Sequence, residues 1–357
     1  MNSFGMKLRF STFGESHGKA LGCILDGVPA GLKIDEAYIQ SELDRRKPGK
    51  SEFETARKEA DSVEILSGVF EGMSTGTPIA MIIYNTNQKS KDYSNIKDVF
   101  RPGHADFTYF HKYGIRDYRG GGRSSARETA ARVAAGAIAK LMLKELDIEV
   151  FSGISEVAGI ASDNFDYEHA KGSIIYALDP TKEEEQKAAI LEAKNMHDSV
   201  GGASRVLIKG VPIGLGQPLY YKLDALLADA MMGLNAVKAV EIGDGVLSSR
   251  VRGSQNNDSI RANGFETNHS GGILGGISNG DDIVLNVYFK PTPSIFQEQR
   301  TVTTTNEEVD FSLKGRHDPC VAIRGTVVCE AMAALVIADM LLLNMGSNME
   351  GVTKYYQ

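Results

Sequence analysis

The sequence predicts a mixed α and β fold, because helical and strand-like segments occur together but do not alternate regularly. Helical patterns cover 35–47, 125–146, 181–196 and 329–345. Strand-like runs such as PIAMIIYN, ASRVLIKGV and DIVLNVYFK lie between them. A regular alternation would predict a doubly wound parallel sheet, whereas this order favours the α+β class.

The helical segments carry end signals and apolar patterns. The segment 35–47 opens with acidic residues and ends with basic ones, as the helix dipole favours. In 125–146, Ser125 and Glu128 form an S-x-x-E capping box, and small apolar residues follow at helical spacing. The segment 181–196 has an acidic first turn, and 329–345 is apolar on most sides. Among the strands, DIVLNVYFK alternates apolar and polar residues, so we expect it to be half-buried.

Length and composition describe a globular chain with a large core. Of its 357 residues, 42% are hydrophobic and 24% are charged, and the net charge is -7. That charge argues against a general nucleic-acid binder, which needs a basic face. No Pro/Ser-rich linker divides the chain, so we expect a single domain over 1–357, with 151–200 as a peripheral segment.

Cysteine usage and apolar runs bear on the cellular compartment. The 3 cysteines form no CxxC pair and are expected to be reduced thiols. The opening MNSFGMKLRF lacks the apolar stretch of a signal peptide, and the late run AMAALVIADMLLL is too short to span a bilayer. These features predict a cytoplasmic protein with no membrane partner.

Glycine gathers with polar residues in several short stretches: FGESHG (13–18), RPGHAD (101–106), YRGGGRSSARET (118–129), NHSGGILGGISNG (268–280) and GRHDPC (315–320). Glycine lets a ligand approach the main chain closely, and loops on a scaffold often carry function. In YRGGGRSSARET, hydroxyls and the guanidinium groups of Arg123 and Arg127 gather at a predicted helix start, where phosphate binds readily. A capped helix after a flexible turn, with solvated arginines, is the alternative. The stretch is not a P-loop, since GxxxxGK[ST] is absent.

His17 and His104 are the candidate acid–base residues. Each lies beside glycine in a compact polar loop, near Glu15 and Asp106 respectively. Histidine can donate or accept a proton near neutral pH, and a leaving phosphate needs a proton or a cation. A structural or merely exposed role stays open for both. No histidine pair has HxH or HExxH spacing, so no metal site is expected.

Further charged residues are candidates for an anion pocket. Arg45 and Arg46 lie at a predicted helix end, where cations also favour the dipole. Asp339 is a carboxylate in an apolar helix, so it either holds a structural hydrogen bond or serves a site. Three more arginines stand beside turn residues: Arg101, Arg316 and Arg324. The residues alone predict an enzyme that binds a multiply anionic small molecule and uses histidine acid catalysis.

Seven blocks, taken in order, resemble the chorismate synthase family: FGESHG, RPGHAD, GGGRSSARET, NAVKAVEIG (235–243), GGILGGISNG, KPTPS (290–294) and GRHDPC. The resemblance runs from about residue 8 to about residue 343. It implies a carbon–oxygen lyase that converts 5-enolpyruvylshikimate 3-phosphate (EPSP) to chorismate and phosphate by anti-1,4-elimination, the last step of the shikimate pathway. It also implies reduced FMN as cofactor, NADPH as a candidate reductant, a homotetramer, and a three-layer β-α-β sandwich with helices packed between two antiparallel sheets.

The resemblance also assigns roles to single residues. It implies that His17 protonates or stabilises the leaving phosphate, that His104 keeps the reduced flavin suitably protonated, and that Asp339 helps the flavin nitrogen regain its basic form. Residues that match the family's flavin-contacting blocks are Arg123, Ser124, Ser125, Asn235, Ala236, Gly275, Lys290, Pro291, Thr292, Pro293, Ser294 and Arg316. Residues that match positions facing substrate anions or the nicotinamide reductant are Arg45, Arg46, Arg101 and Arg127. Lys47 and Glu52 depart from the family's more basic pattern, which leaves open how a nicotinamide nucleotide is handled. No role is assigned to His269 or His317.

Two other functions stay open on the residues alone. A small-molecule kinase would use GGGRSS as a phosphate loop, but the sequence offers no Walker lysine and no clear pair of metal-binding carboxylates. A non-catalytic anion-binding scaffold, for RNA for example, is disfavoured by the net charge of -7 and by the lack of interleaved aromatic and basic residues. Binding of FMN that tightens when EPSP is present would separate the lyase from both.

Overall fold

Two five-stranded antiparallel sheets frame the molecule, which the computed structural model describes over residues 1–55, 59–86, 96–313 and 317–357. The first sheet has the order β1-β2-β3-β7-β4 and contains β1 (Ser3–Phe4), β2 (Arg9–Gly14), β3 (Ala20–Asp26), β4 (Val63–Ile65) and β7 (Ile79–Tyr84). The second has the order β11-β16-β10-β8-β9 and contains β8 (Glu149–Val157), β9 (Ile160–Ala161), β10 (Gly202–Lys209), β11 (Val237–Ile242) and β16 (Ile283–Phe289). The predicted mixture of helices and strands is therefore confirmed, with antiparallel pairing in both sheets.

The three predicted strand runs correspond to β7, β10 and β16. In β16 the burial alternates residue by residue, as the sequence pattern predicts for a half-buried strand. Its buried side chains are those of Ile283, Leu285, Val287 and Phe289, and they join the hydrophobic core. The polar residues between them, such as Asn286, face the other side of the sheet.

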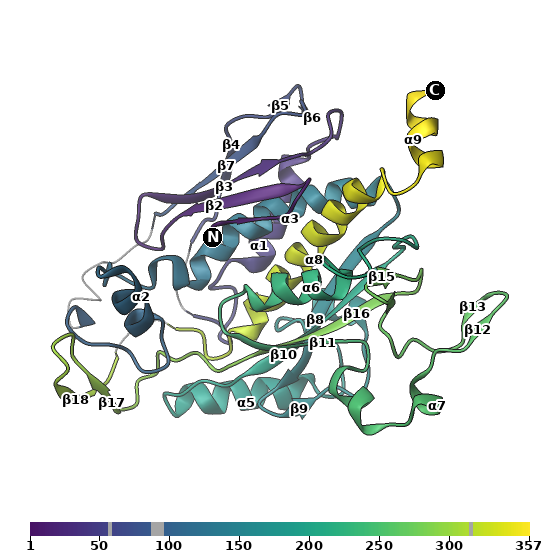
Figure 1. The fold of residues 1–357 in the computed structure, drawn as a ribbon. Helices are drawn as coiled ribbons and strands as arrows, with labels where there is room; N and C mark the ends of the chain where they lie inside the picture. The colour runs from purple at the N-terminus through teal and green to yellow at the C-terminus, as the bar shows by residue number, and fades with distance from the viewer. Residues whose placement is uncertain (56–58, 87–95, 314–316) are drawn as a thin grey trace.

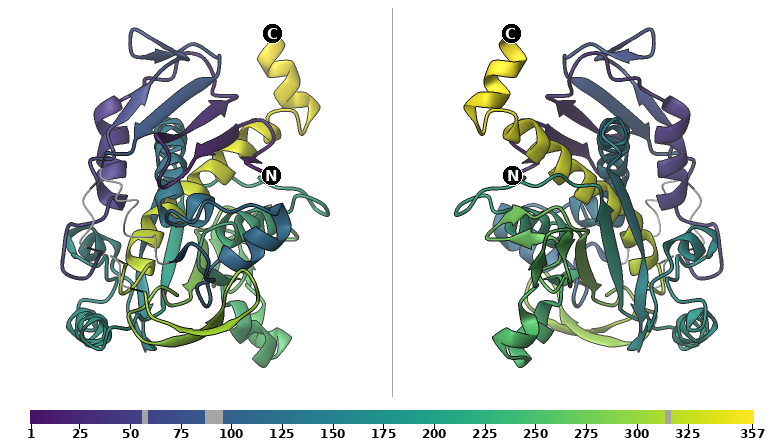
Figure 2. Two further views of the ribbon diagram at one scale, coloured as in Figure 1. Left: turned by 90° about the vertical axis from the view of Figure 1, so that its left-hand side faces the viewer. Right: turned by 90° about the vertical axis from the view of Figure 1, so that its right-hand side faces the viewer.

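α3 (Thr129–Lys144) and α8 (Ala322–Asn344) lie between the two sheets (Figures 1 and 2), α1 (Glu36–Arg46) packs on both of these helices, and α6 (Leu223–Met232) packs on α8 and β11. α3 packs on β3 and β7, α8 packs on β8 and β10, and the two helices pack on each other. A Cβ at Gly136 would lie 2.5 Å from the Cβ of Ala331, so only glycine allows α3 and α8 to approach this closely. The starts of the two helices lie near each other, since Thr129 of α3 and Arg324 and Gly325 of α8 line one small pocket.

α8 is buried at every residue from Gly325 to Met340, which explains why its sequence is apolar on most sides. Among the described residues it is the helix that is long and apolar enough to cross a membrane, yet 83% of its most apolar window is buried inside the protein. It begins at Ala322, seven residues before the predicted start at 329. The sequence pattern missed this first part because Arg324, Gly325 and Thr326 interrupt the apolar run.

The other predicted helices differ from the structure mainly at their ends. α1 begins after Asp35, whose side chain accepts a hydrogen bond from the N–H of Tyr38, and α5 (Glu183–Asn195) has the expected acidic first turn. The predicted start of a helix at Ser125 is wrong: 122–124 and 126–128 form two separate 3-10 turns, η2 and η3, and α3 begins at Thr129. Ser125 caps η3 instead, because its hydroxyl accepts from the N–H of Arg127.

Shorter elements connect the sheets and helices. The segment 151–200 supplies most of β8 and then runs through α4 (Tyr167–Gly172) and α5, which pack against β8. The remaining elements are β5 (Val69–Phe70), β6 (Met73–Ser74), α2 (Asp106–Tyr113), η4 (Gly245–Arg250), α7 (Gly253–Asn256), β12 (Ile260–Arg261), β13 (Gly264–Phe265), β14 (Ile273–Leu274), β15 (Ile277–Ser278), β17 (Gln299–Val302), β18 (Glu308–Phe311) and α9 (Met349–Tyr356). α9 stands away from the body of the molecule at the C-terminus (Figure 1).

Candidate functional site

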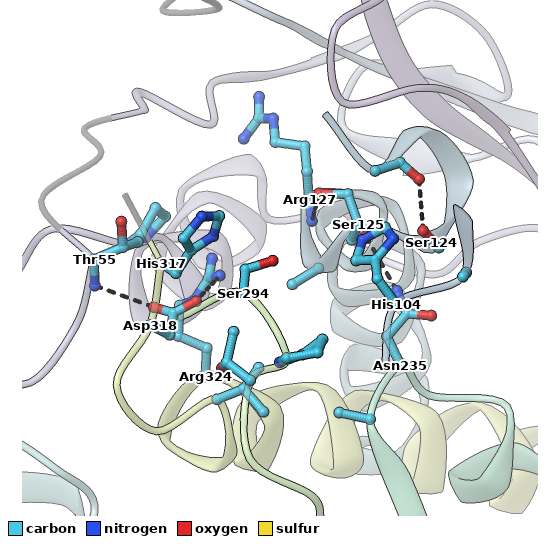
Figure 3. A pocket seen from close by; sticks show the side chains of 18 of the residues that line it. Thr55, His104, Ser124, Ser125, Arg127, Asn235, Ser294, His317, Asp318 and Arg324 are labelled. Carbon is cyan, nitrogen blue, oxygen red and sulfur yellow. Dashed lines mark hydrogen bonds and ion pairs between the residues drawn. The ribbon is translucent and has the colours of Figure 1, made fainter. Parts of the chain in front are cut away.

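A cavity of about 280 Å³ lies where the start of α8, the turns before α3 and several loops meet. Figure 3 shows Ser124, Ser125, His104 and Asn235 on one side, and Thr55, Ser294, His317, Asp318 and Arg324 on the other. The candidate residues that line it are Arg46, Arg101, His104, Ser124, Ser125, Arg127, Asn235, Ala236, Lys290, Thr292, Pro293 and Ser294. Residues from well-separated parts of the sequence thus converge on one site.

The glycine-rich turn ahead of α3 shapes one wall of the cavity. Gly120 has a φ of +77°, and a Cβ at this position would lie 2.3 Å from Nδ1 of His17. Ser124 Oγ donates to the carbonyl of Gly121 at 2.7 Å, and Gly121 itself lines the cavity. Glycine therefore lets the chain turn tightly against His17 while it presents the two serines to the cavity.

Three arginines, Arg46, Arg127 and Arg324, form what we call the arginine wall of the cavity. Asp61 Oδ2 accepts from Arg46 Nη2 at 2.6 Å, and the other oxygen of Asp61 accepts from Arg127 Nη1. Arg324 Nη2 donates to Asp318 Oδ2 at 2.5 Å. Burial would raise the pKa of Asp61, but Arg46 and Arg127 outweigh burial and hold that pKa below its ordinary value. The wall is therefore a set of charged guanidinium groups.

Each arginine of the wall keeps one buried nitrogen that makes no hydrogen bond to the described part of the chain: Arg46 Nε, Arg127 Nη2 and Arg324 Nε. Arg127 Nη2 lies 3.8 Å from Glu59 Oε2, which is an ion-pair distance but too long for a hydrogen bond. Leaving a buried donor without a partner costs about 1–3 kcal/mol, and more when the group is charged. Such donors indicate a ligand with several anionic oxygens.

Arg101 and His104 share the carboxylate of Asp106. Arg101 Nε and Nη2 donate to Asp106 at 2.6 Å and 2.8 Å, and Nη2 also donates to the carbonyl of Gly120 at 3.0 Å. His104 Nδ1 lies 3.1 Å from Asp106 Oδ1, an ion-pair distance, but makes no hydrogen bond with a residue in the described ranges. Burial lowers the pKa of His104, and Asp106 opposes that effect. For Asp106, Arg101 and His104 outweigh burial and hold its pKa well below the ordinary range.

His317 lines the cavity, although the sequence assigned it no role. Its Nε2 is buried and has no hydrogen-bond partner in the described ranges. Burial, and after it the charge of Arg101, lowers the pKa of His317 to about 4, so the imidazole is neutral at pH 7. The glycine-rich block GRHDPC was the available signal for His317 and Asp318. Thr55 and Glu59, which line the cavity, and Asp61, which bonds Arg46 behind it, belong to no motif, so their positions follow only from the fold.

Arg45 does not reach the cavity. Its Nη1 donates to Glu42 Oε1 and to Glu330 Oε1, both at 2.9 Å, and its Nη2 donates to Glu330 Oε2 at 3.0 Å. Lys140 Nζ bonds the same two carboxylates. On a helix, consecutive side chains point about 100° apart, so Arg45 and Arg46 face different neighbours. The structure thus places Arg45 in a cluster between helices rather than among the residues that line the cavity.

Several further candidate residues are not among those that line the cavity. Arg123 Nη2 donates to Thr12 Oγ1 at 2.6 Å and its Nη1 to the carbonyl of Gly14 at 3.3 Å, so it fixes β2. His17 is buried against Gly120, with Nδ1 3.1 Å from Ser16 Oγ. Gly275 lies in the turn between β14 and β15 with a φ of +60°. Pro291 falls between lining residues without lining the cavity itself, and Arg316 lies outside the described residues.

Asp339 also lies away from the cavity. It is fifteen residues beyond Arg324 on α8, which corresponds to about 22 Å along the helix. Its carboxylate accepts three backbone N–H groups, from Met6 at 2.8 Å, Lys7 at 2.7 Å and Leu8 at 2.8 Å. Asp339 therefore anchors the segment that leads into β2 to α8.

The described residues contain no group of three or more histidine, cysteine, aspartate or glutamate side chains that could hold a metal ion. Most polar side chains of the lining are cationic, hydroxyl-bearing or imidazole groups, and its two carboxylates, Glu59 and Asp318, form ion pairs with Arg127 and Arg324. Cations and hydroxyl groups suit phosphate and carboxylate oxygens. The arrangement can therefore bind a polyanion and exchange protons with it.

Comparisons with known proteins agree with this geometry. A sequence model of the family described as chorismate synthase matches residues 8–342. Chorismate synthase of Sulfurimonas denitrificans is 83% identical over 357 residues, which is 100% of both chains, and that of a Sulfurovum species is 72% identical over 356 residues, again 100% of both. A crystal structure of chorismate synthase, 35% identical in sequence, superposes with a TM-score of 0.77 and covers 99% of this chain and 97% of its own.

Proposed function

Since the chain belongs to the chorismate synthase family, we propose that its lyase reaction takes place in the cavity of Figure 3. The chain is thus a carbon–oxygen lyase of the shikimate pathway, which forms chorismate from EPSP. Family membership removes the kinase and the non-catalytic scaffold that the residues alone left open.

The observation that carries the proposal is the set of unpaired nitrogens in the arginine wall. EPSP bears one phosphate and two carboxylates, so it offers anionic oxygens to several guanidinium groups at once. Hydrogen bonds between guanidinium groups and such oxygens are about twice as strong as neutral ones. We place the substrate's anionic groups against Arg46, Arg127 and Arg324, with Arg101 beside them.

We place reduced FMN against the same cavity, along Ser124, Ser125, Asn235 and the loop 290–294. These residues fit a phosphorylated cofactor, because Thr292 Oγ1 is buried without a hydrogen-bond partner in the described chain. Asn235 Nδ2 donates to the carbonyl of Ser125 at 3.1 Å, which ties the two sides of this region together. When bound, the reduced flavin supplies the electron-rich centre that departure of phosphate and loss of a poorly acidic ring hydrogen require.

Two histidines are proposed to carry out the proton transfers of the reaction. His17 gives a proton to the leaving phosphate, and His104 keeps the cofactor suitably protonated. His104 lines the cavity, and His17 packs directly behind the turn of Gly120. Asp339 is proposed to help the flavin nitrogen regain its basic form. Because its carboxylate binds Met6, Lys7 and Leu8, any such effect passes through the N-terminal segment.

The family resemblance extends the proposal beyond the cavity. It supports NADPH as a candidate reductant of the flavin, a homotetramer, and a cytoplasmic location. It also supports the description of the fold as a single-domain, three-layer β-α-β sandwich, with α3 and α8 as the middle layer. Arg123, Gly275, Pro291 and Arg316 remain proposed flavin contacts on the same ground.

An anaerobic assay tests the proposed function. Purified protein receives EPSP with reduced FMN, with oxidised FMN or with no flavin, and release of chorismate and phosphate is followed. We expect product only with reduced FMN. A folded protein that forms no product in any arm and does not bind FMN would contradict the proposal.

A further inference from the structure

Asp61 lies behind the arginine wall and is part of no sequence motif, yet its carboxylate contacts two arginines of the wall. Its side chain is completely buried, with an exposed fraction of 0%. One carboxylate oxygen accepts from Arg46 Nη2 at 2.6 Å, and the other accepts from Arg127 Nη1. Arg46 comes from the end of α1 and Arg127 from η3, so one carboxylate joins two parts of the chain that are 81 residues apart.

The two guanidinium groups need such a carboxylate because they are buried side by side. Burial lowers the pKa of Arg46, Asp61 opposes that effect, and Arg324 and Arg127 add to it. Asp61 lies between the two cations and offsets their repulsion, and Glu59 forms a longer ion pair with Arg127 at 3.8 Å. What the two arginines offer to an anion in the cavity is therefore their unpaired nitrogens.

The remaining nitrogens of the two arginines show how they are oriented. Arg46 Nη1 donates to the carbonyl of Ala126 at 2.9 Å and to Thr129 Oγ1 at 3.2 Å. Arg127 Nε donates to Asn85 Oδ1 at 2.9 Å. Arg46 Nε and Arg127 Nη2 make no hydrogen bond to the described chain, and both side chains line the cavity. Each arginine is thus held on one side and keeps a donor for a ligand.

The backbone at Asp61 is itself held in a costly conformation. Its φ of +49° is left-handed, which is uncommon for a residue other than glycine. Gln40 fixes it from α1, since Gln40 Nε2 donates to the carbonyl of Asp61 at 3.3 Å and Gln40 Oε1 accepts from the N–H of Val63 at 3.2 Å. The contacts with Gln40 maintain this strained backbone, which indicates that the exact position of Asp61 matters.

We propose that Asp61 is a positioning residue for the lyase reaction: it sets Arg46 and Arg127 as a two-pronged clamp for the anionic groups of EPSP. This inference rests on the proposed function of the cavity. It assigns to Asp61 an effect on substrate affinity that acts only through the two arginines.

Charge and geometry predict opposite effects for Asp61→Asn, and this separates a positioning role from a general field effect. Loss of a negative charge makes the cavity more positive, so a pure field effect predicts tighter binding of EPSP. Loss of the clamp predicts weaker binding, because asparagine keeps the shape of aspartate but cannot accept strongly from both guanidinium groups. We expect the Kd for EPSP to rise about tenfold or more.

The experiment measures the Kd of EPSP by calorimetry with oxidised FMN present, so that no turnover occurs. Asp26→Asn is the matched control, since Asp26 forms an exposed ion pair with Arg9 at 3.4 Å far from the cavity. We expect the control to bind like the wild type. We expect Asp61→Asn to weaken binding less in the Arg46→Gln variant than in the wild type, because Asp61 then acts only through Arg127. Equal or tighter binding by Asp61→Asn, or strictly additive losses in the double variant, would overturn the proposal.

Two further measurements keep the proposal testable. If Asp61→Asn does not fold, Gln40→Met loosens Asp61 without touching either arginine, and we expect a smaller rise in Kd in the same direction; an unchanged Kd would contradict the role. If the wild type does not bind EPSP, the proposed function fails, and the clamp is then tested with inorganic phosphate. In that case, equal phosphate affinity in wild type and Asp61→Asn would overturn the clamp as well.

Discussion

Arg45 and Arg46 are neighbours at the end of α1, but they belong to two different kinds of ionic structure. Arg45 joins Lys140, Glu42 and Glu330 in a cluster with two cations and two carboxylates. Ser152 Oγ completes the bonding with a donation to Glu330 Oε2 at 2.8 Å. This balanced cluster lies where α1, α3, α8 and β8 meet.

Arg46 belongs to the arginine wall, whose carboxylate partners are Asp61, Glu59 and Asp318. There Arg46, Arg127 and Arg324 are bonded by Asp61 and Asp318, and each arginine keeps a buried nitrogen without a hydrogen bond to the described residues. The two groups differ in whether their buried donors are paired. Paired donors hold helices together in the first group, whereas the unpaired donors of the second belong to residues that line the cavity where we propose that the substrate binds.

The largest expected effect comes from breaking the balanced cluster. Glu330→Gln leaves Arg45 and Lys140 with one carboxylate between them, and removing one partner of a buried ion pair typically costs about 3–5 kcal/mol. We expect the free energy of unfolding, measured by urea denaturation, to fall by about that amount. Glu350→Gln is the control. Glu350 Oε1 lies 2.7 Å from Lys354 Nζ in an exposed ion pair, which should contribute less than about 1 kcal/mol to the free energy of unfolding. A loss for Glu330→Gln no larger than for this control would refute the distinction.

The next effect concerns turnover in the cavity. We expect His17→Ala and His104→Ala each to lower the turnover rate about a hundredfold or more while the protein stays folded, since both are assigned proton transfers. His169→Ala serves as the control, because His169 bonds Glu183 away from the cavity at 2.6 Å. Normal turnover in a well-folded His17→Ala/His104→Ala double variant would show that neither histidine acts as acid or base.

A smaller effect is expected at Asp339, where geometry favours a structural hold. Asp339→Asn replaces one accepting oxygen by an amide that faces backbone N–H groups, so we expect about 1–3 kcal/mol less stability. If Asp339 also tunes the flavin through the N-terminal segment, turnover falls more than FMN affinity does. Unchanged stability together with lost FMN binding would make Asp339 a ligand contact instead.

A further expected effect, confined to low pH, is a pH dependence of stability. Burial would raise the pKa of Glu330, but Lys140 and Arg45 outweigh burial and lower that pKa to about 2 from an ordinary value of 4.5. Its stabilising contribution is therefore complete above about pH 4.5 and is lost as the pH falls towards 2. The unfolding free energies of wild type and Glu330→Gln should converge over this range. A constant difference between them down to low pH would contradict the depressed pKa.

The sequence predicted much of the fold from local patterns. Alternation in β16 and the end signals of α1 were enough to place these elements, since both patterns depend on neighbouring residues. The start of α3 was misplaced because the S-x-x-E pattern also fits a 3-10 turn, and Ser125 caps such a turn here. The arrangement of the two sheets around the helices depends on long-range contacts such as Gly136 with Ala331, which no local pattern reveals.

The site could be predicted only in part, for the same reason. Glycine-rich blocks marked His104 and Ser124, the family resemblance marked the loop 290–294, and most of these residues do line the cavity. Sequence position could not separate Arg45 from Arg46, because the helix end signal treats both alike. The sequence could not identify Asp61 as a site residue. Its proposed role depends on contacts with two arginines, and only the fold brings these to its two carboxylate oxygens.

The most direct test of the account compares Arg45→Gln with Arg46→Gln, two identical changes one residue apart. The measurement is the Kd for EPSP with oxidised FMN, together with the free energy of unfolding. The account predicts that Arg46→Gln weakens EPSP binding about tenfold or more, whereas Arg45→Gln binds EPSP like the wild type and is less stable. Equal weakening of EPSP binding by both variants, or weakening by Arg45→Gln alone, would contradict it.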